Sequence, residues 1–503
     1  MIYSCLMVFR GRLHDRPVLL SVKDTSVSLA VGDDWIGAWD VGGRLYSLWK
    51  GGHTYRRGLN GRILHKWRED GRGVRDPYDA RQRVHVEGEG ANALVQEAAD
   101  VLRGALVAVT GDPSTWLDAA WRRLDAAVLA SFERCARFDA AAAREDARRF
   151  ARVFSPVGIL PPDQYLSIVL QATEGCAFGT CTFCDLYHER YRVKSADEFL
   201  RHADAVRDFL GDSIRLRGRS VFLGAANALA VPMPRILEFF EVIAAVFDAP
   251  GRPVHAFVDG FTGARKTAVD YAALREKGLR RVYVGLESGH DPLLAFVRKP
   301  AARDQAVEAV RAIKACGVSV GVIVMIGLGG ERFAAGHVRY TIAAVNDMRF
   351  GPDDLLFFSD LVEVPGTAYP QRAADEDVRP LALDARLAQF AAVRAGLVFE
   401  GRPPHLARYD VREFVYYGSE RFSRLTILYY RTERAEKRSD PLTSHDRLRP
   451  QARRLHHRVL CEHHLGRCRS PARVAACQPR DRSRSTSAGN SPRDRILGQS
   501  AFG

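Results

Sequence analysis

The sequence has few cysteines for its length, nine in 503 residues. This content is too low for a disulfide scaffold. Long apolar runs are missing as well: the charge-free stretch Gly317–Gly330 near the middle has 14 residues, whereas a membrane-spanning helix needs about 20. The apolar start, Met1–Phe9, lacks the basic residues and cleavage site of a secretory leader. We therefore expect a cytoplasmic protein without disulfides and without contact with a membrane.

Acidic residues are outnumbered, because 74 Lys and Arg face 60 Asp and Glu and give a net charge of +14. Much of this excess lies in residues 435–503, where 14 Arg and one Lys face six acidic residues, a balance of +9. The segment shows no hydrophobic periodicity, and we expect a disordered basic tail. Such a tail can bind nucleic acid by neutralising phosphates. Arginine is abundant throughout the chain, however. The basic tail is therefore better explained by the general composition of the chain than by a dedicated binding site.

Turn dipeptides divide the amino-terminal part into short segments. Gly42-Gly43, Gly51-Gly52 and Asn60-Gly61 follow one another at nine-residue intervals within Val18–Trp67. Glycine and asparagine adopt the backbone conformations that tight hairpin turns require, so this spacing predicts a meander of β-strands. The sequence therefore begins with a small β-rich domain.

Helical periodicity follows in Ala91–Val109 and Trp116–Phe154, and prolines from Pro156 onward end it. From Tyr165 the pattern becomes apolar strand, loop and amphipathic helix, repeated roughly every 25–40 residues. The predicted strands are Leu166–Leu170, Ser220–Leu223, Val254–Val258, Arg281–Gly285, Val318–Met325 and Leu355–Leu361, and the predicted helices are Ala196–Leu210, Pro234–Phe247, Thr267–Lys277, Asp304–Ala315 and Glu331–Met348.

Strands that alternate with helices indicate an α/β fold with a parallel sheet, most simply a (β/α)6 partial TIM barrel. Chemistry is then expected at the carboxyl ends of the strands. The predicted organisation is a β-rich domain at 1–85, a helical connector at 86–160, the partial barrel at 161–417 and the basic tail at 418–503.

Three thiols lie within nine residues directly after the first predicted barrel strand: Cys176, Cys181 and Cys184. Thiolates bind iron–sulfur clusters or zinc. Three of them can hold three irons of a [4Fe-4S] cube and leave the fourth iron open to a small ligand. Zinc is the alternative, because His188 could complete a closed Cys3His site.

On these residues the chain resembles the radical S-adenosylmethionine (radical SAM) superfamily. The hallmark of this family is a three-cysteine loop after the first barrel strand, usually with an aromatic residue before the last cysteine, and Phe183 occupies that position. The family usually has three and then two residues between its cysteines. This chain has four and then two, an insertion within Ala177–Thr180.

Further segments at predicted strand ends extend the resemblance over Tyr165–Tyr369. They lie after strands two, four, five and six, where family members contact the methionine or adenine part of the cofactor. The resemblance implies the cofactor-binding residues Phe183, Asn227, Glu287, Ser288, Gly327 and Gly329, and backbone contacts at Val364–Thr367. Helix capping by Glu287 and Ser288, and an ordinary strand-to-helix turn at Gly327–Gly330, are the simpler readings of two of these segments. Asp259 and Glu363 are acidic residues near the ends of the third and sixth predicted strands. They either face the substrate or lie on the surface.

The resemblance implies a radical SAM enzyme with one [4Fe-4S] cluster and S-adenosyl-L-methionine as cofactors. The open iron would bind the amino and carboxylate groups of S-adenosylmethionine. An electron from a reductase-type donor, flavodoxin or ferredoxin, would release methionine and a 5′-deoxyadenosyl radical, which abstracts hydrogen from an unknown substrate in the barrel. Two other hypotheses remain open: a zinc-binding nucleic-acid module with a basic tail, and a barrel that acts on RNA.

Overall fold

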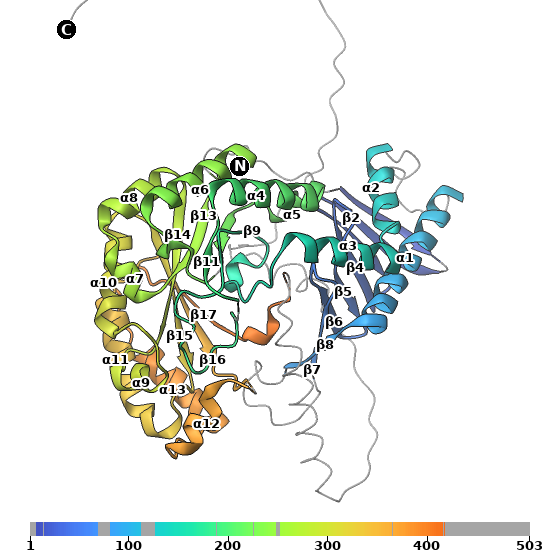
Figure 1. Ribbon diagram of the computed structural model, residues 1–503. Helices are drawn as coiled ribbons and strands as arrows, with labels where there is room; N and C mark the ends of the chain where they lie inside the picture. The colour runs from blue at the N-terminus through green and yellow to red at the C-terminus, as the bar shows by residue number, and fades with distance from the viewer. Residues whose placement is uncertain are drawn as a thin grey trace, which may run out of the picture. The chain divides into compact units, whose positions relative to one another are not determined.

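A computed structural model of the chain describes residues 7–417, except residues 14, 69–80, 112–125, 188, 225, 248–251, 365 and 416 (Figure 1). The described residues belong to one compact unit. The predicted basic tail and His188, the fourth ligand of the zinc hypothesis, lie outside the described residues.

The amino-terminal part is an antiparallel sheet in which every strand pairs with the next one along the chain. Alternate residues of a strand point to opposite faces, and in Ser26–Val31 the residues are accordingly buried in alternation. The three glycine-containing dipeptides form the turns between β4 and β7, as the sequence predicts. The strands are β1 (Met7–Leu13), β2 (Arg16–Val22), β3 (Ser26–Val31), β4 (Trp35–Asp40), β5 (Leu45–Lys50), β6 (His53–Arg57), β7 (Ile63–Arg68) and β8 (Arg81–Val86).

Three helices follow the sheet: α1 (Gly88–Gly111), α2 (Ala126–Ala136) and α3 (Ala140–Val153). Leu102 of α1 and Phe132 of α2 lie in one hydrophobic core with strand residues such as Leu29. Helices α1 and α2 thus share a core with the sheet.

The second part is a parallel sheet with the strand order β17-β16-β15-β14-β13-β12-β9. The two outermost strands, β9 and β17, do not pair with each other, so the barrel is partial, as predicted. The strands are β9 (Ile168–Gln171), β12 (Val221–Gly224), β13 (Val254–Val258), β14 (Leu279–Glu287), β15 (Ser319–Ile326), β16 (Leu355–Asp360) and β17 (His405–Tyr409).

Strand β17 is a seventh barrel strand that the sequence analysis does not predict. Its residues, His-Leu-Ala-Arg-Tyr, include two polar side chains and none is fully buried. The six predicted strands are apolar because both faces of their sheet are covered. An edge strand such as β17 is less buried and can contain polar residues. Its sequence therefore lacks the apolar run by which the other strands are predicted.

Helices cover the outer side of this sheet, where α8, α10 and α11 follow one another around it (Figure 1). Ser195 begins α4 with a capping box, since its hydroxyl accepts a hydrogen bond from the Glu198 backbone N–H. The longer helices are α4 (Ala196–Leu210), α6 (Met233–Val246), α8 (Ala268–Glu276), α10 (Arg303–Ala315), α11 (Gly330–Asp347) and α13 (Leu383–Ala395); shorter ones are α5 (Ile214–Arg217), α7 (Gly260–Arg265), α9 (Asp291–Phe296) and α12 (Ala368–Asp375). No helix within the described residues is long and apolar enough to span a membrane.

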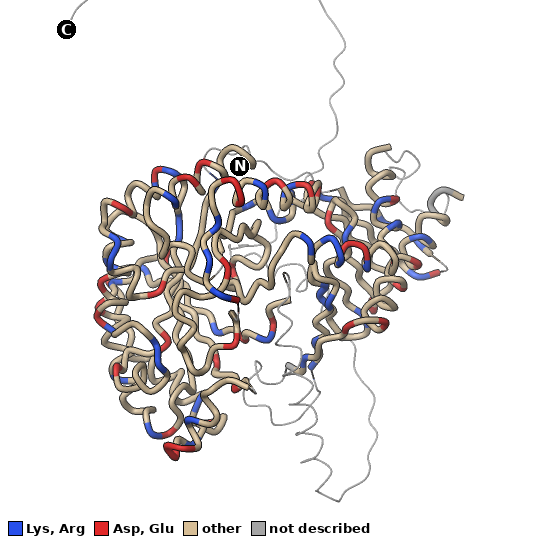
Figure 2. The backbone as a smooth tube through the Cα atoms, in the orientation of Figure 1, with Lys and Arg blue, Asp and Glu red and all other residues tan. Residues whose placement is uncertain are grey.

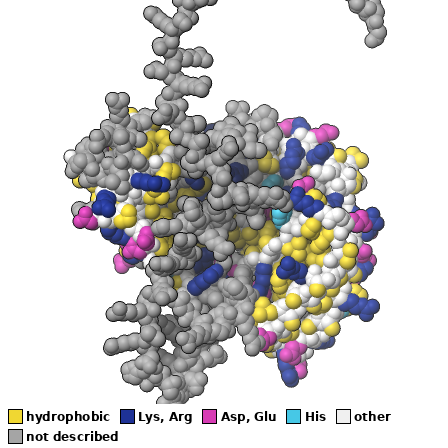
Figure 3. All heavy atoms as spheres, turned by 180° about the vertical axis from the view of Figure 1, so that it is seen from behind, with side chains coloured by type: hydrophobic (Ala, Val, Ile, Leu, Met, Phe, Trp, Pro, Cys, Tyr) yellow, Lys and Arg dark blue, Asp and Glu magenta, His cyan; other side chains and the backbone are white. Residues whose placement is uncertain are grey.

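The amino end of the barrel is filled by side chains. The Tyr283 hydroxyl donates to Asp163 at 2.5 Å, and Arg281 forms an ion pair with the same carboxylate at 3.1 Å. The ring of Tyr283 also covers Gly321, where a Cβ atom would come within 2.4 Å of it. Tyr283, Arg281 and Asp163 thus occupy the interior at this end of the barrel. On the face drawn in Figure 3, the barrel carries hydrophobic and uncharged side chains across its middle and charged ones mainly around its edge.

Buried ionic contacts join the amino-terminal sheet to the barrel. Asp40 at the end of β4 pairs with Arg217 of α5 at 3.4 Å, and the two side chains are 0% and 2% exposed. Arg44 donates to the backbone oxygens of Phe209 and Leu210 at the end of α4. Buried charged groups therefore hold the sheet against the barrel.

A buried histidine of α4 makes the stability of the fold depend on pH. The Nε2 atom of His202 accepts a hydrogen bond from the Gln171 backbone N–H at 3.0 Å, and burial lowers the pKa of His202 to about 4. The unfolded chain binds a proton near pH 6.5, so stability is complete above this pH and falls as the pH decreases toward 4. Lowering the pH from 7.5 to 5 should cost about 2 kcal/mol of unfolding free energy through this group.

Urea titrations of the full chain and of His202→Gln at both pH values test this expectation. The variant should lose about 2 kcal/mol less than the wild type over the same interval, because a glutamine does not titrate. An equal loss in both proteins would show that His202 is not responsible.

Candidate functional site: the cysteine loop and its pocket

The three cysteines lie in a loop that leaves the carboxyl end of β9. Two short strands, β10 (Thr173–Glu174) and β11 (Arg192–Val193), pair antiparallel and close its base. Glu174 forms ion pairs with Arg192 at 3.0 Å and with Lys194 at 2.9 Å. Hydrogen bonds from Arg192 and Lys194 lower the pKa of Glu174 to about 2. The base of the loop is thus fixed by charge as well as by backbone pairing.

The loop is also anchored to helices on the far side of the barrel. The Thr182 backbone N–H donates to the Val297 oxygen after α9 at 3.0 Å, and the Thr182 oxygen accepts from the Tyr369 N–H of α12 at 3.0 Å. The Thr180 hydroxyl donates to the Arg298 oxygen at 3.1 Å. These bonds hold the loop over the carboxyl ends of the strands.

Cys176, Cys181 and Cys184 are free thiols. Cys176 and Cys181 are half-buried, whereas Cys184 is exposed because it opens onto a pocket. Surrounding protein atoms and the other two thiols raise the pKa of Cys184, to about 12. Burial likewise raises the pKa of Cys181. Without a bound metal these two thiols stay protonated at neutral pH, and metal binding would displace their protons.

The described metal donors of the loop are its three thiols, since His188 lies outside the described residues. Among the residues that the structure describes, no three His, Cys, Asp or Glu side chains converge closely enough to hold one metal ion. A cubane does not require such convergence, because each thiolate binds a different iron. The thiols nevertheless lie near one another, since Cys181 and Cys176 both act on the pKa of Cys184.

Two glycines shape the loop, and they offer a matched test. Gly175 and Gly179 have φ of +69° and +62°. A Cβ atom on Gly175 would lie 2.2 Å from the Glu189 backbone oxygen, whereas one on Gly179 would meet nothing within 4 Å. Gly175→Ala should therefore distort the loop and strongly lower iron incorporation, and Gly179→Ala should cost about 1 kcal/mol at most with normal iron content. Equal iron content in both variants, measured after reconstitution, would contradict this account.

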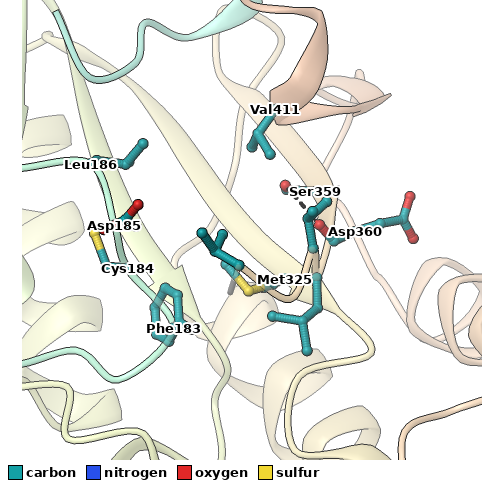
Figure 4. A pocket seen from close by; sticks show the side chains of 11 residues that line it. Phe183, Cys184, Asp185, Leu186, Met325, Ser359, Asp360 and Val411 are labelled. Carbon is teal, nitrogen blue, oxygen red and sulfur yellow. Dashed lines mark hydrogen bonds between the residues drawn. The ribbon is translucent and has the colours of Figure 1, made fainter. Parts of the chain in front are cut away.

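A pocket lies beside the cysteine loop (Figure 4). The loop contributes Phe183 and Cys184 to its wall, β15 contributes Met325, and the end of β16 contributes Ser359. Most of the remaining side chains are apolar: Leu186, Leu361, Val362, Val364 and Val411, with Asp185 and Asp360. The third thiol of the loop thus faces a largely apolar space at the carboxyl ends of the last predicted strands.

Glu287 ends β14 in an unusual backbone conformation. Its φ is +60°, and the pairing of β14 with β15 is irregular between Gly285 and Glu287. A Cβ atom on Gly285 would come within 2.5 Å of the Glu287 carboxylate, so glycine is needed there for Glu287 to fold back. A strained conformation of a non-glycine residue is often kept for function.

Lys299 faces Glu287 at 3.5 Å, and each side chain is only 12% exposed. Burial raises the pKa of Glu287. Burial alone would lower the pKa of Lys299, but the nearby Glu287, Cys181, Asp259 and Cys184 outweigh it and raise that pKa. Lys299 is therefore a buried cation beside the thiols. The sequence analysis does not identify Lys299. The available signal was its position, because Arg298 and Lys299 are the first Arg or Lys residues that follow Glu287 in the sequence.

Ser288 is fully buried and lies against α11. Its hydroxyl is 2.9 Å from Nδ1 of His337 and accepts from the His290 backbone N–H at 3.1 Å. The structure thus brings Glu287 to the cysteine loop and engages Ser288 in packing between α9 and α11. Ser288 does not cap α9, because the N-cap of this helix is His290, which makes no side-chain capping hydrogen bond, and the cofactor contact of Ser288 stays a prediction.

Asn227 is also buried, at the end of β12. Its side-chain amide donates to the Asp259 carboxylate, and its oxygen accepts from the Asp259 backbone N–H at 3.1 Å. Asp259 in turn accepts from the Thr262 N–H at the start of α7. This pair ties the ends of two neighbouring strands together. Glu363, the other acid noted in the sequence, is exposed after β16.

Gly327 and Gly329 form the turn from β15 into α11, both with positive φ. The Gly327 N–H donates to the Gln389 side chain at 2.8 Å, and the Gly329 N–H donates to the Tyr369 hydroxyl at 3.0 Å. A Cβ atom on Gly329 would meet Leu293 at 2.4 Å. The glycines therefore allow a tight strand-to-helix turn next to Met325 of the pocket, and their backbone donors are already satisfied.

Comparison with known proteins gives three kinds of match. The family model of the radical SAM superfamily matches residues 170–334. A candidate methylthiotransferase of Methanocaldococcus jannaschii is 23% identical over 180 residues, which are 33% of this chain and 37% of that protein. The chain thus spans just over a third of the length of this curated relative.

Among solved structures, coproporphyrinogen III oxidase from Escherichia coli has a TM-score of 0.35 and 14% identity, over 49% of this chain and 54% of that one. The radical S-adenosylmethionine methyltransferase TsrM from Kitasatospora setae has a TM-score of 0.32 and 16% identity, over 42% and 39%. The family match begins within β9 and ends within α11, so it contains the cysteine loop, Glu287 and Lys299. The chain therefore contains a radical SAM domain at residues 170–334.

Proposed function

We propose that the chain is a radical SAM enzyme whose Cys176, Cys181 and Cys184 hold one [4Fe-4S] cluster. The observation that carries the proposal is the position of the cysteine loop, which lies over the carboxyl ends of the barrel strands and places Cys184 in the wall of an apolar pocket. When bound, such a cluster supplies the electron that cleaves S-adenosylmethionine into methionine and a 5′-deoxyadenosyl radical.

The residues around the pocket have separate tasks in this proposal. Phe183, Met325 and Leu361 supply apolar surface for the adenosyl part of S-adenosylmethionine and keep water away from it. Lys299 would neutralise the carboxylate of the methionine part, and Glu287 would receive its ammonium group. Both are buried beside the thiols, so each charge acts in a medium that screens it little. The substrate would enter on the side of this pocket, and the Tyr283–Asp163 hydrogen bond occupies the opposite end of the barrel.

The direct test is the product of the proposed cleavage. Full-length protein, reconstituted with iron and sulfide without air and reduced with dithionite, should release 5′-deoxyadenosine and methionine from S-adenosylmethionine in equal amounts. A substrate is not required, because uncoupled cleavage suffices. A colourless protein that carries one zinc per chain and forms no 5′-deoxyadenosine would contradict the proposal and support the zinc hypothesis.

A further inference from the structure

One side of the pocket comes from the segment that follows the last barrel strand. Val411 lines the pocket and begins the short helix η6 (Val411–Glu413), directly after β17. In Figure 4 its side chain points into the pocket from a segment of its own. Val411 packs against Val364, as Leu186 beside the cysteine loop does. The segment Asp410–Phe414, here called the strap, therefore supplies a side of the pocket that neither the cysteine loop nor the strands provide.

Charges of the amino-terminal sheet hold the strap. Arg83 of β8 pairs with Asp410 at 2.6 Å, and the two side chains are 7% and 2% exposed. Lys66 of β7 donates to the Glu413 carboxylate at 3.0 Å. Lys and Arg recur along the strands of this sheet (Figure 2), and Lys66 and Arg83 are direct partners in the pairing of β7 with β8. Two neighbouring cations of the sheet thus bind the strap on both sides of Val411.

The contacts of the Asp410 carboxylate differ in what they can fix. Arg412 pairs with it at 2.6 Å, but this contact lies within the strap and moves with it. Arg83 connects the same carboxylate to the sheet. Burial alone would raise the pKa of Asp410, and Arg412 and Arg83 outweigh this effect and lower it. A buried carboxylate that loses such a partner is strongly destabilised, so without Arg83 the strap should leave its place.

We propose that Arg83 is a positioning residue of the pocket, which holds the strap so that Val411 stays in the wall against which S-adenosylmethionine binds. The identity of this ligand rests on the proposed function. If the wall is in place in only a fraction of the molecules, the apparent affinity falls by that fraction. The amino-terminal sheet thereby contributes to cofactor binding through the strap, although the pocket is lined by the loop, the barrel and the strap.

The experiment uses Arg83→Met, Val411→Ala and the double variant of the full chain. Methionine keeps the apolar stem of the arginine and removes its charge, whereas Val411→Ala removes part of the wall and leaves every charge in place. Calorimetry measures the binding of S-adenosylmethionine to reconstituted protein with an oxidised cluster, which cannot cleave it. With dithionite as reductant, 5′-deoxyadenosine formation gives KM and kcat.

We expect each single variant to raise the Kd and the KM about five- to tenfold and to leave kcat within about twofold of the wild type, because Arg83 touches no reacting group. The double variant should bind no more weakly than the weaker single variant, since both changes act on one contact. Arg83→Lys keeps the charge and should restore most of the affinity. An unchanged KM in Arg83→Met, or two effects that multiply in the double variant, would overturn the positioning role.

Arg57→Met is the matched control. Arg57 lies on β6 of the same sheet, is 2% exposed and pairs with Asp146 of α3 at 3.2 Å. Its loss removes a buried ion pair that does not involve the strap, so the KM should stay within about twofold of the wild type even where stability falls. A KM that rises as much as in Arg83→Met would show that any loss of buried charge in the sheet has this effect, and the proposal would be wrong.

Lys66→Met takes the place of Arg83→Met if that variant does not fold. It removes the partly exposed contact with Glu413, and the KM should rise about threefold; an unchanged KM would contradict the proposal. The wild type separates this inference from the proposed function. If it forms 5′-deoxyadenosine with dithionite and Arg83→Met has a normal KM, the positioning role is wrong and the enzyme assignment stands. If the wild type neither binds nor cleaves S-adenosylmethionine, the proposed function itself fails.

Discussion

Replacing Cys181 with alanine should remove the cluster and, with it, cleavage of S-adenosylmethionine. Cys181 is half-buried between Thr180 and Thr182, both of which are hydrogen-bonded to the segment after α9, so its place in the loop is fixed. Loss of residues that merely support a metal ligand commonly costs 10- to 100-fold, and loss of a ligand should cost more than about 100-fold. Iron content and 5′-deoxyadenosine formation after reconstitution measure the effect.

Cys316 provides the control. Its half-buried thiol lies after α10 and donates to the Ile313 backbone oxygen at 3.1 Å, away from the cysteine loop in the sequence. Cys316→Ala should keep the iron content and the activity of the wild type. If both variants bind iron equally, Cys181 is not a ligand.

Replacing Arg217 with methionine should have the largest effect on stability. The guanidinium is 2% exposed and pairs with Asp40, which is fully buried, and it also bonds to Tyr417 near the end of the described chain. Methionine fills a similar volume but leaves the Asp40 carboxylate without its partner. Removing one member of a buried ion pair costs about 3–5 kcal/mol. Urea unfolding at neutral pH should show a loss of this size.

Arg215, two residues earlier on the same helix, is exposed and forms no ion pair within the described part of the chain. Arg215→Met should therefore change the unfolding free energy by no more than about 0.5 kcal/mol. Similar losses in the two variants would mean that the Asp40–Arg217 contact does not hold the amino-terminal sheet to the barrel.

The strands of the barrel could be predicted because their burial leaves a clear pattern. Val254–Val258 is apolar except for His255, and the structure has a strand over the same residues. Leu355–Leu361 is predicted one residue longer than β16. The sequence also places the cysteine loop and Glu287 after the carboxyl ends of strands, and in the structure Lys299 lies beside both Glu287 and the thiols.

The partners of individual side chains could not be predicted, because they come from distant parts of the chain. Ser288 stands next to Glu287 in the sequence, yet its hydroxyl meets His337 of α11. Asn227 is at the expected strand end, but Asp259 occupies its amide. Lys299 joins the site only because the chain turns back after α9 toward Glu287. A sequence gives the strand end at which a residue lies, and packing decides which neighbour its side chain meets.

Electron paramagnetic resonance of the anaerobically reconstituted, dithionite-reduced full chain tests the central claim most directly. Three thiolates hold three irons and leave the fourth for S-adenosylmethionine. The spectrum should therefore contain the signal of a reduced [4Fe-4S] cluster, and its g-values should shift when S-adenosylmethionine is added. Absence of a cubane signal, or a signal that S-adenosylmethionine leaves unchanged, would contradict the account.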